Sequence, residues 1–158
     1  MSGTIVLGIG NRLGGDDAAG THVVDMLNRR MKRATGSPTS EIVAIDTGTA
    51  PESYTSVIRQ HRPDLLIMVD AADMGLPAGA LRIIPPEKIS VLSFSTHHMP
   101  LSMFVSYVNE FCGKILLVGV QPEGTEMSKC LSKAVRKSVK ELAEAILEGR
   151  VAEIPLLA

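Results

Sequence analysis

Residues 5–17 of the chain read IVLGIGNRLGGDD, and this stretch decides the fold class. Its first five residues are apolar and partly β-branched, which is typical of a strand buried on both faces. Gly10 ends that run. From Asp17 to about Ala34, apolar residues recur at helical spacing and basic residues gather near the end, as suits a helix dipole. The stretch therefore predicts a buried strand, a glycine-rich turn and a helix.

The rest of the chain continues the alternation of short apolar runs and helical patterns. Further strands are predicted at 41–45, 65–69 and 114–120, and further helices at 51–61, 100–111 and 128–148. The segment 79–84 follows a turn rich in Gly and Pro with no helix before it, so this strand is expected to run antiparallel. We predict a three-layer α/β/α sandwich with a twisted, mostly parallel five-stranded sheet and one antiparallel strand at about 79–84.

Composition limits the classes of protein to which the chain can belong. Its 158 residues suit a single domain over 1–158. A formal net charge of -1 without a basic stripe argues against nucleic acid as the main partner. No apolar stretch reaches the roughly 18 residues that a membrane span needs. The chain opens without a signal-peptide pattern, and Cys112 and Cys130 lack metal-type spacing, so we expect reduced thiols in a cytoplasmic protein.

Acidic and imidazole side chains follow the predicted strands. Ligands of an open parallel sheet bind beyond the carboxyl ends of its strands. The residues at those positions are Asp16, Asp17, Asp46, Asp70, Asp73, His97, His98 and Glu123. Several acids in one place repel one another unless a cation or protons neutralise them. Two carboxylates and one imidazole would suit a divalent ion, and the imidazole favours a transition metal over magnesium or calcium.

Each of these residues also has a simpler structural interpretation. We expect Asp16 or Asp17 to cap the helix that follows, since Asp is common at that position. Asp46 precedes Thr47 and Gly48 and fits a turn. Asp70, taken alone, fits a turn at a strand end equally well. A lone loop histidine is more often a surface residue than a ligand. Only the combination of these residues at one sheet edge favours a site.

A dinucleotide-binding protein is the alternative that the first turn suggests. Gly8 and Gly10 follow the spacing of a phosphate-binding turn, but Leu13 stands where the third glycine belongs. Asp16 and Asp17 would place two negative charges at the helix N-terminus that has to receive the pyrophosphate. The sequence therefore disfavours this alternative.

Five segments, taken in order, resemble the motifs of the hydrogenase maturation endopeptidases. They are Gly8–Gly20 (GIGN followed by GDDAAG), Asp46–Glu52 (DTGTAPE), Val69–Gly75 (VDAADMG), Thr96–Leu101 (THHMPL) and Leu117–Pro122 (LVGVQP). They are spread in order over residues 8–122, which is most of the chain. The pattern is most similar to that of the enzymes serving hydrogenase 3-type and related archaeal large subunits.

The resemblance implies an endopeptidase that removes a short C-terminal extension from the precursor of a [NiFe]-hydrogenase large subunit after nickel insertion. It also implies that Asp17, Asp70 and His97 bind the metal. The nickel is expected to be held by the substrate, so the resting enzyme is expected to be metal-free. His98 directly follows His97, which leaves two candidate imidazoles, and the alignment with Met99 and Pro100 favours His97.

The resemblance leaves the hydrolytic step open between two mechanisms. The attacking water is either polarised by the metal or deprotonated by a carboxylate. Asp46 is the first candidate for that catalytic carboxylate, followed by Asp16 and Asp73. No serine or cysteine with an orienting base stands out in the sequence. A metal-sensing chaperone that binds the large subunit without cutting it is the second functional hypothesis.

Overall fold

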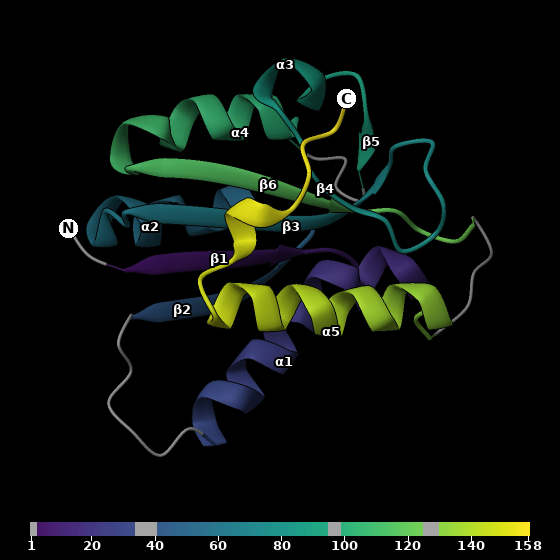
Figure 1. Ribbon diagram of the computed structural model, residues 1–158. Helices are drawn as coiled ribbons and strands as arrows, with labels where there is room; N and C mark the ends of the chain where they lie inside the picture. The colour runs from purple at the N-terminus through teal and green to yellow at the C-terminus, as the bar shows by residue number, and fades with distance from the viewer. Residues whose placement is uncertain (1–2, 34–40, 95–98, 125–129) are drawn as a thin grey trace.

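A central sheet separates two layers of helices in the computed structural model, which describes residues 3–33, 41–94, 99–124 and 130–158 (Figure 1). Across the sheet the strands follow the order β2 (Ile42–Gly48), β1 (Thr4–Ile9), β3 (Leu65–Asp73), β6 (Lys114–Val120) and β4 (Leu81–Ile83). The first four of these are parallel, whereas β4 runs antiparallel to β6. The predicted three-layer fold and its antiparallel strand are confirmed.

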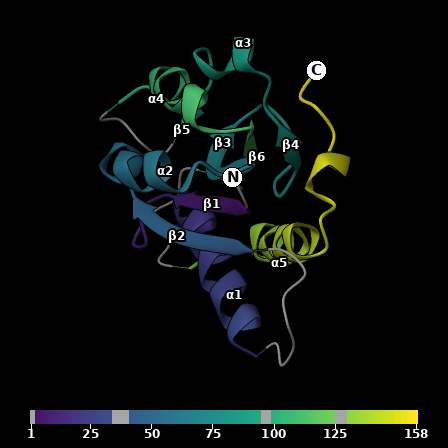
Figure 2. The ribbon, with the colours of Figure 1, turned by 90° about the vertical axis from the view of Figure 1, so that its left-hand side faces the viewer.

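The helices cover both faces of the sheet. On one face lie α1 (Ala19–Arg33) and α5 (Lys133–Leu147), and on the other lie α2 (Thr55–His61) and α4 (Leu101–Val108) (Figure 2). Neighbouring strand residues alternate between two apolar cores, so that Val6 packs toward α1 and α5 while Leu7 packs in the opposite core. The almost uninterrupted apolar runs of the strands follow from this burial on both faces.

Several helices begin or end in 3-10 turns. These are η1 (Gly15–Ala18) before α1, η2 (Pro51–Tyr54) before α2, η3 (Asn109–Phe111) after α4 and η4 (Val151–Glu153) after α5. The predicted helices thus occur, with α5 starting after the Ser132 N-cap. The short helix α3 (Pro86–Ile89) was not expected, and its prolines occupy the start of a helix, where a missing amide costs nothing.

Strand β3 is longer than the apolar pattern predicts. The sequence predicted a strand over 65–69 that ends at Asp70. In the structure, β3 pairs with β6 as far as Ala71, and then with the two-residue strand β5 (Ser93–Phe94) at Ala72 and Asp73. Hydrogen bonds to both neighbours continue the strand past the first charged residue. Asp70 therefore lies inside the strand, and β5 forms a second antiparallel pair that the sequence did not reveal.

Glycines allow α1 to lie directly on the end of the sheet. A Cβ on Gly20 would stand 2.3 Å from the Val69 carbonyl oxygen and 2.5 Å from that of Ile9. A Cβ on Gly8 would in turn stand 2.2 Å from the Gly20 carbonyl oxygen. Because any side chain at these positions would collide with backbone, glycine is what brings η1 over the carboxyl ends of β1 and β3.

The C-terminal segment covers the β4 edge of the sheet. The Ile83 amide donates to the Pro155 carbonyl oxygen at 2.8 Å, and the Leu157 amide donates to the Ile83 carbonyl oxygen at 2.9 Å. This pairing protects an edge that would otherwise offer unpaired backbone groups. Within the described ranges, no helix has both the length and the apolarity needed to cross a membrane.

Candidate active site

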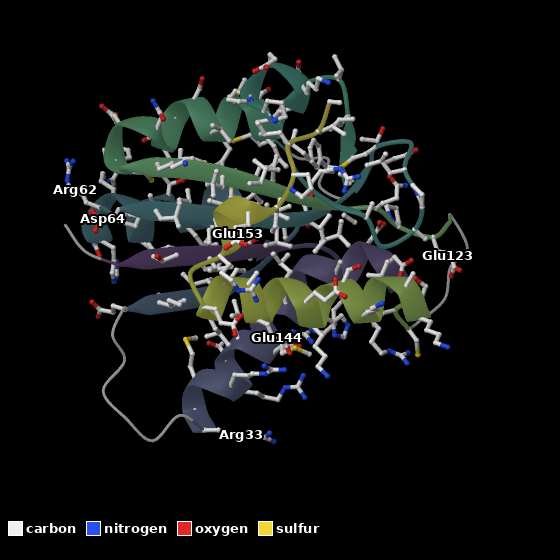
Figure 3. The ribbon with its side chains drawn as sticks, viewed as in Figure 1. Arg33, Arg62, Asp64, Glu123, Glu144 and Glu153 are labelled. Atoms are coloured by element: carbon white, nitrogen blue, oxygen red, sulfur yellow. The ribbon has the colours of Figure 1, made fainter. Side chains whose placement is uncertain are left out.

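A cleft of about 580 Å³ opens at the carboxyl edge of the sheet. Its walls come from the turn after β1, the end of β3, strand β5 and the segment after β6. They comprise Asn11, Leu13, Gly14, Asp16, Asp17, Ala71, Ala72, Asp73, Ser93, Phe94, Gln121, Pro122, Glu123 and Gly124. Figure 3 shows Glu123 at this end of the molecule and Asp64 at the opposite end. Carboxylates thus gather where the sequence predicted, at one edge of the sheet.

Asp16 and Asp17 are neighbours in η1 but have different surroundings. The Asp16 carboxylate accepts hydrogen bonds from the Ser132 amide at 2.7 Å, from the Ser132 hydroxyl at 2.9 Å and from the Glu123 amide at 2.9 Å. It thereby joins η1 to the start of α5 and to the segment after β6. Asp17 is exposed in the cleft. Asp16 is thus held by three hydrogen bonds from other segments, and Asp17, which also lines the cleft, is the more exposed of the two.

The expectation that one of these two acids caps the helix is wrong. The chain enters its first helical turn through Gly14, which is the N-cap and makes no side-chain capping bond. Both acids lie inside η1, where their charge still suits the positive end of the helix dipole. The helix begins with a 3-10 turn that starts at Gly15, so the N-cap position falls on Gly14 and not on either acid.

Asp70 and Asp73 lie three residues apart at the end of β3. Asp70 is fully buried, with an exposed fraction of 0%, and it pairs in register with Gly119 of β6. Burying a carboxylate costs free energy unless neighbouring groups compensate its charge, so the surroundings of Asp70 have to provide that compensation. Asp73 is exposed and lines the cleft. The strand thus supplies one buried and one accessible acid.

Gln121 holds the Asp73 end of the cleft together. This buried side chain accepts hydrogen bonds from the Met74 amide at 2.7 Å and the Leu76 amide at 3.3 Å, and its nitrogen donates to Asp73 Oδ1 at 3.3 Å. The sequence gave no signal of the role of Gln121, because its partners lie at the end of β3 and in the loop that follows, more than 40 positions away. Gln121 fixes both that loop and the direction of the Asp73 carboxylate.

Asp46 belongs to a network beside the cleft and is not among the residues that line it. Its Oδ2 accepts from Arg12 at 2.9 Å, and its Oδ1 accepts from the Thr21 hydroxyl at 3.2 Å and from the Gly48 amide at 3.0 Å. Arg12 also donates to Asp25 at 2.8 Å. Hydrogen bonds to Asp25 and then Asp46 raise the pKa of the Arg12 guanidinium, so it stays cationic. The catalytic role suggested for Asp46 stays a prediction.

Cys112 lies apart from the cleft, just before β6 at the amino edge of the sheet. Burial raises the pKa of its thiol to about 11. A thiol with this pKa remains protonated at neutral pH and is a poor nucleophile. Cys112 is therefore not a candidate nucleophile.

The histidine segment falls outside the described residues. Both His97 and His98 belong to the range 95–98, so the proposed set of Asp17, Asp70 and His97 stays a prediction. Among the residues that the structure does describe, no three His, Cys, Asp or Glu side chains gather in a way that could hold a metal ion. Asp17 and Asp70, the two carboxylates of the proposed set, are among the described residues.

Comparison with known proteins gives a consistent result. The family model of the hydrogenase maturation proteases matches residues 21–149. The hydrogenase 3 maturation protease of Escherichia coli strain K12 is 33% identical over 146 residues, which span 92% of this chain and 88% of that protein. The chain belongs to the hydrogenase maturation protease family. It is therefore a peptidase that acts in hydrogenase maturation.

Solved structures of maturation proteases share this fold over almost their whole length. The solution structure of the endopeptidase HycI from Escherichia coli has a TM-score of 0.82 at 31% identity and covers 99% of this chain and 97% of that one. The crystal structure of a [NiFe] hydrogenase maturation protease HycI from Thermococcus kodakarensis KOD1 has a TM-score of 0.78 at 34% identity, with 94% and 92% covered.

The close approach of η1 to Gly10 explains the glycine-rich first turn. A Cβ on Gly10 would stand 2.1 Å from the Asp17 carbonyl oxygen. The glycine therefore makes room for η1, which carries the acids, rather than for a pyrophosphate. The dinucleotide alternative has no support from this geometry, and the family assignment favours a peptidase over a chaperone that does not cut.

Proposed function

We propose that this maturation protease removes a C-terminal extension from the precursor of a [NiFe]-hydrogenase large subunit after nickel insertion, and that it recognises the inserted nickel. The observation that carries the proposal is the packing of the segment that holds Asp17 against the strand that holds Asp70. Asp17 is exposed in the cleft on η1, which packs against the strand that holds the buried Asp70. Relatives that mature hydrogenase 3 support this choice of substrate.

The proposed nickel ligands are Asp17, Asp70 and His97, and the nickel itself arrives as part of the substrate. Carboxylate and imidazole suit a divalent transition ion. The exposure of Asp17 lets an incoming metal centre reach it from the cleft. Asp70 is buried at the end of β3, and a cation bound there would compensate the charge of a buried carboxylate. The two described side chains fit the proposed role.

Hydrolysis requires that a water molecule attack the scissile carbonyl carbon while its proton passes to a base and the amide nitrogen leaves with a proton. Nickel, when bound, supplies Lewis acidity to this reaction. Of the spare acids, Asp73 lines the cleft and is oriented by Gln121. Both oxygens of Asp46 instead accept hydrogen bonds from protein groups. This geometry favours Asp73 over Asp46 if a carboxylate takes the proton.

Intact-mass analysis of a nickel-loaded precursor incubated with the protein tests the proposal. We expect the wild type to remove a C-terminal peptide, and Asp17→Asn and Asp70→Asn to be slower by about 100-fold or more, as for loss of a group that acts in the transition state. Asp64→Asn is the matched control, because this exposed acid directly precedes β3, at the end of the sheet opposite to the cleft (Figure 3). Thermal unfolding checks that each variant is folded.

The outcomes separate the parts of the proposal. Normal processing by both Asp17→Asn and Asp70→Asn would refute the ligand assignment, and equal cleavage of nickel-free precursor would refute nickel recognition. A stable complex without any mass loss would favour the non-cleaving chaperone for this precursor. Replacement of His97 is expected to slow processing more than replacement of His98, and the reverse result would reassign the ligand.

A further inference from the structure

Leu13 presents a large apolar side chain to solvent at the cleft. It is 79% exposed and is one of the residues that line the cleft. Single exposed leucines are common on protein surfaces and need no explanation. The position of Leu13 is different, because it borders the cleft that carries the proposed chemistry and because its backbone is fixed in place.

The turn that carries Leu13 is held on both sides. The Leu13 amide donates to Asn11 Oδ1 at 3.0 Å, and the Gly14 amide donates to the Asn11 carbonyl oxygen at 2.8 Å. Arg12, between Asn11 and Leu13, is anchored by its pairs with Asp25 and Asp46. A turn fixed in this way keeps the leucine displayed. Preorganisation of this kind lowers the entropy lost when a partner binds.

Other apolar residues line the same cleft as Leu13. Phe94, Ala71, Ala72 and Pro122 lie among its walls, together with the acids. We propose that Leu13 is an apolar anchor for the protein substrate, and that an apolar side chain of the precursor packs on it as the precursor enters the cleft. This inference rests on the proposed function, and it assigns to Leu13 a role in binding the precursor and none in hydrolysis.

Leu156 provides a matched control. It is also an exposed leucine, at 65%, but it lies in the C-terminal segment beside Ile83 and is not a wall of the cleft. The hydrogen bonds of this segment run through its backbone, so a side-chain substitution leaves them in place. The two leucines thus differ in location far more than in chemistry or exposure.

The test measures precursor binding and turnover for Leu13→Asn, Leu13→Met and Leu156→Asn. Loss of a buried leucine contact predicts that Leu13→Asn raises Kd and KM about tenfold or more. Its kcat is expected to stay within about twofold of the wild-type value, since Leu13 touches no reacting group. Leu13→Met, which keeps size and apolarity, and Leu156→Asn are expected to bind like the wild type. All three are expected to keep the wild-type unfolding temperature.

Wild-type affinity in Leu13→Asn would overturn the inference, as would an equal loss of affinity in Leu156→Asn. A fall in kcat at unchanged KM would also overturn it, because that result would mean a role in the chemical step. If the wild type binds the precursor through Leu13 but removes no peptide, the proposed function fails and this inference stands. If the wild type does not bind the precursor at all, both fail.

Discussion

Adjacent acids in η1 are predicted to give opposite results when each is replaced by asparagine. Asp16 joins three segments of the chain through its hydrogen bonds to Ser132 and Glu123, whereas Asp17 is exposed in the cleft. We predict that Asp16→Asn destabilises the fold. Asp17→Asn is predicted to abolish precursor processing while stability changes little.

The size of the Asp16 effect follows from its hydrogen bonds. Asparagine keeps one acceptor oxygen, which can still receive the Ser132 amide, but it turns N–H donors toward the Glu123 amide. Because a hydrogen bond to a charged group contributes about 1.5–3 kcal/mol and Asp16 is only half-buried, we expect the free energy of unfolding to fall by about 2 kcal/mol. For a chain of this length, that loss corresponds to an unfolding temperature lower by about 4–8 °C.

The assay pairs thermal unfolding, followed by circular dichroism, with the rate of C-terminal mass loss from nickel-loaded precursor. Asp17→Asn is expected to unfold within about 2 °C of the wild type, as is usual for exposed substitutions. The reasoning is refuted if Asp16→Asn unfolds at the wild-type temperature, or if the two variants lose the same stability. Equal losses would mean that the hydrogen bonds of Asp16 contribute no more to stability than the contacts of Asp17.

Three further substitutions test the packing and chemistry of the site. Gly20→Ala is predicted to lower the free energy of unfolding by more than about 3 kcal/mol, because the new Cβ would stand 2.3 Å from the Val69 carbonyl oxygen. Gly124→Ala is the control, because a Cβ there meets nothing within 4 Å. Equal urea midpoints for the two variants would contradict this prediction. Gln121→Leu leaves the amides of Met74 and Leu76 without their acceptor and is predicted to lower the free energy of unfolding, measured in urea, by about 2–4 kcal/mol. A change near zero would contradict the role of Gln121 in fixing the loop. Cys112→Ala is predicted to retain full processing activity at neutral pH, because its pKa of about 11 keeps the thiol protonated there, and a large loss of turnover would reopen thiol catalysis.

Local pattern was sufficient for most of the secondary structure. The strand predicted at 114–120 has those bounds in the structure, and the strand predicted at 5–9 begins one residue earlier. Apolar runs report burial on both faces without reference to any distant residue, which is why these predictions held. The same reasoning failed at the end of β3, because pairing with β5 and β6, and not the local pattern, carries that strand to Asp73.

Sequence alone determined that acids would gather at the carboxyl edge of a parallel sheet, since the acids directly follow the predicted strands and parallel strands end at the same edge. Only the tertiary structure decided what each acid does there. The two partners of Asp16 lie 107 and 116 positions away along the chain, and those of Asp46 lie up to 34 positions away. No local pattern encodes hydrogen bonds between segments so far apart, so the division between structural and accessible carboxylates emerges only when the folded chain brings those segments together.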